Sequence, residues 1–182
     1  MQDDDERQKN EGGPHPSSPC LPRCVSPRLQ APVPHHDSEE QNRAGFVSTH
    51  RYLSDTVLAE KDYSTYVSEA LKTAKLSNDA FGVAVAEAAQ KGLRSGGGQS
   101  MFKSILQAQK RLYAEGTLPA YSLAQTCALL DEKQAAFEYL QRAFDRRESA
   151  LLALRIDFKL LSLQNEPSCN ELLKKVGLPP LS

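Results

Sequence analysis

The amino-acid sequence predicts an all-α protein made of antiparallel helical hairpins. Two observations support this prediction: proline is frequent before residue 50 and rare after it, and apolar residues after residue 55 recur at helical spacing. A third is that glycines or short polar breaks separate the periodic stretches, as expected where one helix turns back into the next. We therefore expect a short stack of hairpins, closed by a C-terminal capping helix and preceded by a disordered N-terminal tail.

The composition favours a small domain without bulk affinity for polyanions. Hydrophobic residues make up 40% of the 182 residues and charged residues 25%, which allows one moderate core and an unfolded segment. The formal net charge of −1 gives no general attraction to nucleic acid or anionic lipid. No apolar run approaches the roughly 18 residues of a membrane span, and the acidic start is unlike a signal peptide. We therefore expect a cytoplasmic protein that binds neither nucleic acid nor membrane.

Residues 1 to 50 are expected to form the disordered tail. Seven of the eleven prolines lie between residues 14 and 34, mixed with serine, glycine and charged residues, and no apolar period survives there. The tail also contains residue types that bind zinc, namely Cys20, Cys24, His35 and His36. Because no core surrounds these residues, we favour disordered sequence over a zinc site and expect no metal or other cofactor.

The folded domain is expected over residues 55 to 182, beginning with a helix from about residue 57 to 75. The apolar side chains of this helix share one stripe and are Tyr63, Tyr66, Val67, Ala70, Leu71 and Ala74. We find no neighbouring hairpin before it in the sequence. Its open face would favour a homodimer or a missing partner, since stacked repeats are stabilised by their neighbours.

Residues 79 to 115 are expected to form a first, weaker hairpin. Asn78 or Asp79 is placed to cap its first helix, and Gly96 to Gly98 end that helix because they permit a turn of either hand. The second helix stops at Gly116. The stretch RSGGGQS is weakly similar to a phosphate-binding loop, but it lacks the lysine and the preceding strand, so we favour a plain turn.

The clearest hairpin is predicted over residues 119 to 147. Pro119 fits the first turn of its first helix, where the missing N–H costs nothing. The break at Asp131 and Glu132 is so short that the second helix must return antiparallel to the first. Cys127 lies on the apolar face of the first helix and is expected to be a small core residue rather than a reactive thiol.

This hairpin resembles a tetratricopeptide repeat over YSLAQTCALLDEKQAAFEYLQRAF, residues 121 to 144. Leu123 and Ala124 stand where that repeat has its leucine and small residue, and Cys127 stands where an aromatic residue is usual. The small, large and small positions of the second helix are Ala136, Leu140 and Ala143.

Three positions depart from the repeat pattern: Asp131 replaces the usual inter-helix glycine, Ala120 replaces a bulky residue, and Glu148 stands where proline is common. The resemblance nevertheless continues to about residue 180, where LLKKVGLPP is similar to the closing segment of bacterial tetratricopeptide proteins. In those proteins the repeats commonly follow a DNA-binding, kinase or cyclase domain, of which we recognise no sign here. The resemblance implies a short tetratricopeptide-like solenoid with a C-terminal cap.

The capping segment is expected over residues 150 to 178. Its leucine-rich part, Leu151 to Leu163, is expected to be buried over the last repeat. A final helix follows, with Asn165 as its cap, Pro167 in its first turn and Gly177 at its end.

The free face of the first helix in a repeat suits the binding of a peptide or another protein. The resemblance implies that Tyr121, Ser122, Gln125 and Leu129 line such a groove, with ordinary surface or packing residues as the alternative. We expect a non-catalytic protein–protein interaction module, a scaffold or adaptor, that binds its partner in this groove or at the open helical end. The alternative is the sensor or assembly part of a bacterial transcription regulator or signalling protein that lacks its front domain.

No catalytic constellation is recognised, so we expect no enzyme activity. His50 is the only histidine near the folded part, and a nucleophile without a positioned base is inert. Arg146 and Arg147 are expected to complement a helix C-terminal dipole rather than to bind phosphates, because Asp145 and Glu148 flank them and no aromatic residues are interleaved.

Overall fold

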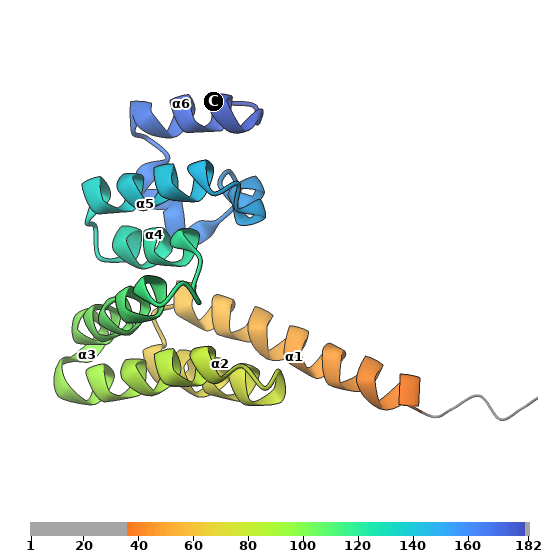
Figure 1. The fold of residues 1–182 in the computed structure, drawn as a ribbon. Coiled ribbons are helices and arrows are strands. Elements are labelled where there is room, and N and C mark those ends of the chain that lie inside the picture. Colours follow the sequence, from red (N-terminus) through yellow and green to blue (C-terminus); the bar gives the residue numbers. More distant parts are fainter. Residues whose placement is uncertain (1–35, 181–182) are drawn as a thin grey trace, which may run out of the picture. The chain divides into compact units, whose positions relative to one another are not determined.

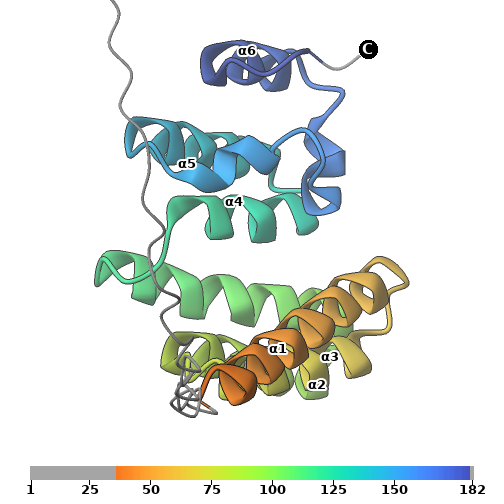
Figure 2. The same cartoon turned by 90° about the vertical axis from the view of Figure 1, so that its right-hand side faces the viewer.

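The computed structural model describes residues 36 to 180, and side chains from residue 45 onward. Every regular element in this part of the chain is helical, so the predicted all-α class is confirmed (Figure 1 and Figure 2). The elements are α1 (His36–Ala59), α2 (Tyr63–Leu76), α3 (Ala80–Ala114), α4 (Ala120–Leu129), α5 (Lys133–Asp145), the 3-10 helices η1 (Ser149–Ala153) and η2 (Phe158–Leu163), and α6 (Pro167–Val176). Each α-helix contacts the next one along the chain.

Helix α1 extends further toward the N-terminus than the sequence predicts. It begins at His36, so residues 36 to 50 are helical and the prediction of a disordered tail is wrong for them. The remainder of the predicted tail, residues 1 to 35, lies outside the described residues.

The single helix predicted from about residue 57 to 75 is divided into the end of α1 and all of α2. The chain turns at Lys61, which has a left-handed φ of 63°. Asp62 then caps α2, because its carboxylate accepts a hydrogen bond from the Thr65 N–H at 3.1 Å, and this bond lowers the pKa of Asp62. Asp79 caps α3 in the same way. The first helix is thus part of a hairpin, α1–α2, that the sequence analysis missed.

Helix α3 folds back on itself at the predicted glycines. Its backbone leaves helical geometry at Gly96 and Gly97, and Gly97 has a φ of 69°, which glycine adopts without strain. The two halves then pack so closely that a Cβ on Gly92 would lie 2.8 Å from the Cα of Met101. The predicted hairpin over residues 79 to 115 is confirmed.

Helices α4 and α5 form the hairpin predicted around residues 119 to 147. Asp131 has a left-handed φ of 60°, a conformation that glycine adopts more readily than aspartate. The N-terminus of α4 is capped by a residue that follows α5. Glu148 accepts hydrogen bonds from the N–H groups of Ala120 (2.8 Å) and Tyr121 (2.9 Å). A charged acceptor at a helix N-terminus stabilises the unsatisfied N–H groups there.

The C-terminal segment after α5 is folded against the last hairpin as predicted. Four leucines between residues 151 and 163 are buried: Leu151, Leu154, Leu160 and Leu163. Three apolar side chains of the same segment are exposed: Leu152, Ile156 and Leu161. Pro167 begins α6 and Gly177 ends it with a φ of 83°, as expected, but the N-cap is Glu166 and the prediction of Asn165 is wrong.

Candidate interaction site

The residues predicted to line a groove on α4 face the C-terminal segment of the same chain. The Tyr121 hydroxyl and the Gln125 amide both donate hydrogen bonds to Asp157 Oδ2, at 2.9 Å and 2.6 Å. Tyr121 is 4% exposed, whereas Ser122 and Leu129 are half-buried. Burial, followed by the charge of Asp157, raises the pKa of Tyr121 and keeps its phenol protonated. The four residues share one helix, but two of them are engaged within the chain.

Residues 157 to 163 make one further contact with α4 and one with α1. Lys159 forms an ion pair with Asp55 of α1, with 2.7 Å between Nζ and Oδ1. The Ser162 hydroxyl donates a hydrogen bond to the backbone oxygen of Ala128 at 3.1 Å. Asp157 of the same chain thus occupies the polar groups of Tyr121 and Gln125, and the groove over these four residues stays a prediction.

A second surface, between α2 and the first half of α3, is open and positively charged, and we call it the basic groove. Its cavity of about 390 Å³ is lined by Ser64, Val67, Ser68, Leu71, Lys72, Lys75, Gln90, Leu93 and Arg94. Three of these residues are cationic and none is acidic. Lys75 and Arg94 are exposed and form no ion pair with any described residue, whereas Lys72 donates to Glu69 at 2.6 Å.

The basic groove could not be predicted from the sequence, because the cations of the groove come from two helices whose packing the sequence does not specify. Lys72 and Lys75 are spaced i, i+3 on α2, which places them on one face. Arg94 is 19 residues further on and opens the RSGGGQS stretch. The turn at these glycines is confirmed, and the structure places Arg94 in the groove while the glycines only reverse the chain.

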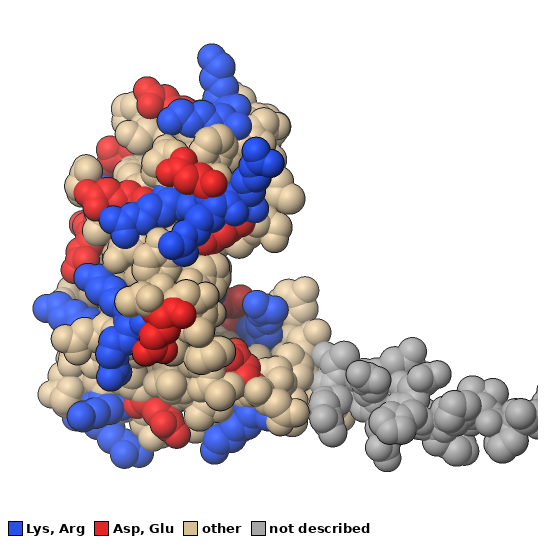
Figure 3. Space-filling view, viewed as in Figure 1, with Lys and Arg blue, Asp and Glu red and all other residues tan. Residues whose placement is uncertain are grey.

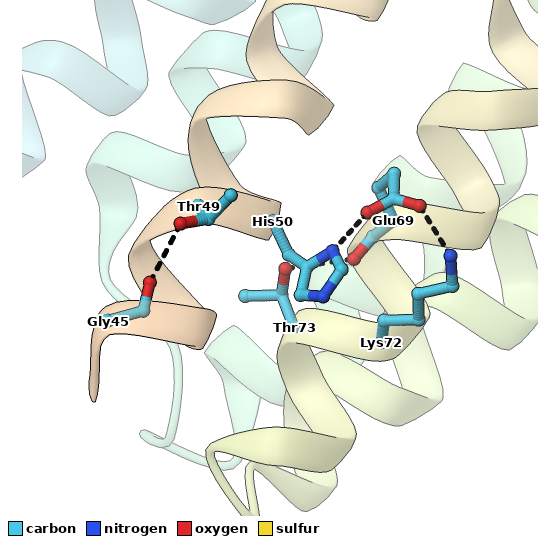
Figure 4. A network of polar contacts seen from close by, with 6 residues as sticks. All are labelled: Gly45, Thr49, His50, Glu69, Lys72 and Thr73. Atoms are coloured by element: carbon cyan, nitrogen blue, oxygen red, sulfur yellow. Dashed lines mark hydrogen bonds and ion pairs between the residues drawn. The ribbon is translucent and has the colours of Figure 1, made fainter. Parts of the chain in front are cut away.

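A buried carboxylate lies beside the basic groove and joins α1 to α2 (Figure 4). Glu69 is 5% exposed, and its two carboxylate oxygens contact His50 Nδ1 and Lys72 Nζ. The hydrogen bond from Lys72 lowers the pKa of Glu69, burial opposes this, and His50 adds to the lowering. Glu69 is therefore held as a carboxylate whose charge keeps Lys72 and His50 in place.

The pKa of Glu69 makes the α1–α2 contact sensitive to acid. Because the folded-state pKa lies below the unfolded value of 4.5, the stabilisation is present above that value and is lost as the pH falls through the folded pKa. We expect Glu69→Gln to reduce the loss of thermal stability below this pH. The matched change Glu87→Gln, at an exposed position of α3, should leave the slope of melting temperature against pH unchanged. Equal slopes for the wild-type protein and Glu69→Gln would contradict this assignment.

Both cysteines of the described residues, Cys127 and Cys169, are buried. Cys127 is fully buried, and burial together with the charge of Glu132 raises its pKa to about 11, so the prediction of a core residue is confirmed. Burial also raises the pKa of Cys169. From residue 45 to 180, no group of three or more His, Cys, Asp or Glu residues is placed to hold a metal ion. The side chains of Cys20, Cys24, His35 and His36 lie outside the described residues.

Comparison with known proteins adds no assignment to these surfaces. No protein-family model matches the sequence, and neither the curated proteins nor the solved structures provide a match. Of the helices described between residues 36 and 180, none combines the length and apolar character needed to cross a membrane.

Proposed function

We propose that this protein is a non-catalytic interaction module, a tetratricopeptide-like helical scaffold, that binds an acidic segment of a partner protein in the basic groove. The observation that supports the proposal is the lining of this groove, which contains three cations and no carboxylate. Two of the cations are not paired with any described residue, so they are available to an acidic ligand. Complementary charge supplies specificity and speeds association.

The apolar residues of the basic groove supply the second requirement for binding a peptide. Leu71 and Leu93 lie between its polar residues and are half-buried, whereas Val67 at its base is a core residue. Acidic side chains of an extended segment would pair with Lys75 and Arg94, while its apolar side chains would contact Leu71 and Leu93. Removal of their apolar surface from water contributes to affinity at roughly 25 cal/mol per Å² before the entropy of association is subtracted.

The hairpins α1–α2, α3 and α4–α5 support the scaffold part of the proposal. Repeat arrays of about three units bury a continuous core and present surfaces between neighbouring helices. The basic groove occupies such a position between two successive hairpins. We therefore place the binding surface near the N-terminal end of the stack and not on α4.

The proposal is tested with the full-length protein and a fluorescein-labelled peptide of glutamate and leucine, using fluorescence anisotropy. We expect Lys75→Glu combined with Arg94→Glu to weaken binding about tenfold, since two partly exposed ion pairs are worth roughly 1.4 kcal/mol together. The matched control is Lys103→Glu combined with Arg111→Glu, which makes the same charge change on the second half of α3, outside the basic groove. Equal losses for the two double variants would mean that net charge, and not the groove, attracts the peptide.

A further inference from the structure

Two arginines of α5 lie over tyrosine rings where α5 meets the end of α3. The guanidinium carbon of Arg142 is 5.1 Å from the centre of the Tyr139 ring, and that of Arg146 is 4.5 Å from the centre of the Tyr113 ring. The two rings contact each other edge to face, with 5.9 Å between their centres. Both arginines are exposed, so the rings hold them from one side only. We call these four residues the arginine–tyrosine cluster.

Neither guanidinium group of this cluster forms an ion pair within the described part of the chain. The ion pairs found there number four, and none includes Arg142 or Arg146. Of the neighbouring carboxylates, Asp145 accepts a hydrogen bond from a glutamine amide and Glu148 accepts from the N-terminus of α4. Figure 3 shows lysine and arginine side chains gathered across the level of α5 on this face, with acidic ones beside them.

The fold gives Arg146 an aromatic contact that the sequence does not show. The sequence shows no aromatic residue interleaved with Arg146 and Arg147, but the fold brings Tyr113 from α3 beneath the first of them. Only Tyr139, Arg142 and Arg146 share a helix, and their spacing of i, i+3 and i+7 places them on one face. The contribution of Tyr113 depends on tertiary packing.

Stacking on the rings prepares both guanidinium groups to bind an anion. A guanidinium fixed by its face keeps its N–H edges free, and its planar fork can donate two parallel hydrogen bonds to a phosphate or carboxylate. Residues spaced i, i+4 on a helix have Cβ atoms about 5–6 Å apart, so one multivalent anion can reach both side chains. The loss of side-chain freedom on binding is reduced because the stacked side chains are already ordered.

We propose that Arg142 and Arg146 bind a phosphorylated serine or threonine side chain of a partner protein. A phosphoryl group carries a charge of about −1.5 to −2 and three acceptor oxygens, which match two guanidinium groups. A single carboxylate has one charge and two oxygens, and one arginine satisfies it. This site is separate from the basic groove and does not depend on the function proposed for that groove.

The test uses the full-length protein and two fluorescein-labelled peptides of one sequence, which contain either serine or phosphoserine. We expect the phosphopeptide to bind about tenfold more tightly than the serine peptide, because charge-assisted hydrogen bonds are roughly twice as strong as neutral ones. We expect Arg142→Lys combined with Arg146→Lys to abolish this difference, since lysine keeps the charge but lacks the planar fork. The control is Arg147→Lys combined with Arg155→Lys, two exposed arginines without a ring contact, which should retain the preference.

Four results would overturn the proposal. Equal affinity for the two peptides would show that the phosphoryl group is not recognised, and an unchanged preference in the Arg142 and Arg146 double variant would place recognition elsewhere. Inorganic phosphate that binds as tightly as the phosphopeptide would assign the site to the free ion. Tighter binding of a single-stranded oligonucleotide, lost in the same double variant, would assign it to nucleic acid.

Discussion

Replacement of Leu163 by alanine is expected to lower the free energy of unfolding by about 2–5 kcal/mol. Leu163 is fully buried at the end of η2, in a cluster that also contains leucines of α5 and α6. Truncation of its side chain would leave a cavity that close packing cannot refill. Urea denaturation followed by far-UV circular dichroism measures this loss as a lower midpoint.

Leu161 provides the control for this experiment two residues away. It lies in the same 3-10 helix but is 57% exposed. Leu161→Ala should therefore change the free energy of unfolding by no more than about 0.5 kcal/mol. If the two variants were equally stable, residues 157 to 163 would be a loosely attached segment, and the face of α4 beneath them would be available to a partner after all.

Replacement of Gly92 by alanine is expected to destabilise the protein by about 1–3 kcal/mol, which is typical of overpacking. A Cβ at Gly92 would lie 2.6 Å from the backbone oxygen of Ser100 and 2.8 Å from the Cα of Met101. These are backbone atoms that cannot rotate away, so the two halves of α3 would have to separate.

The same substitution at Gly45 should stabilise the protein instead of destabilising it. Gly45 lies within α1, and a Cβ there would meet no atom within 4 Å. Alanine loses less backbone freedom in a helix than glycine does, so Gly45→Ala should stabilise the protein by roughly 0.5–1 kcal/mol. Thermal unfolding of both variants measures this difference, and a destabilised Gly45→Ala together with a neutral Gly92→Ala would contradict the packing of α3 described above.

Local signals in the sequence predicted the second half of the fold well. Pro119 and the glycines at 96 to 98 act through their own backbone preferences, so the hairpins they delimit could be located without knowledge of the rest of the chain. The turn at Lys61 could not be located in this way. Lysine has no preference for a left-handed φ, so nothing in its own chemistry indicates a turn there.

The candidate sites were harder to predict because they depend on contacts between distant residues. Asp157 reaches Tyr121 across more than thirty positions, and nothing in a repeat pattern indicates that the C-terminal segment will engage the residues assigned to a groove. Tyr113 and Arg146 likewise belong to different hairpins. Sequence patterns specify which face of a helix is apolar, but they do not specify which side chain of a neighbouring element will lie opposite a charged residue.

The ion pair between Lys159 and Asp55 bears on how the molecule unfolds. In a simple array each repeat touches only its neighbours, so the ends can fray while the middle stays folded. Here the segment that follows the last hairpin is bound to the first one, and Phe158 also packs against the N-terminal apolar cluster. Loss of the C-terminal segment would therefore expose α1 as well as α4. We expect hydrogen exchange at the two ends of the stack to be coupled, as in a globular protein that opens as one cooperative unit.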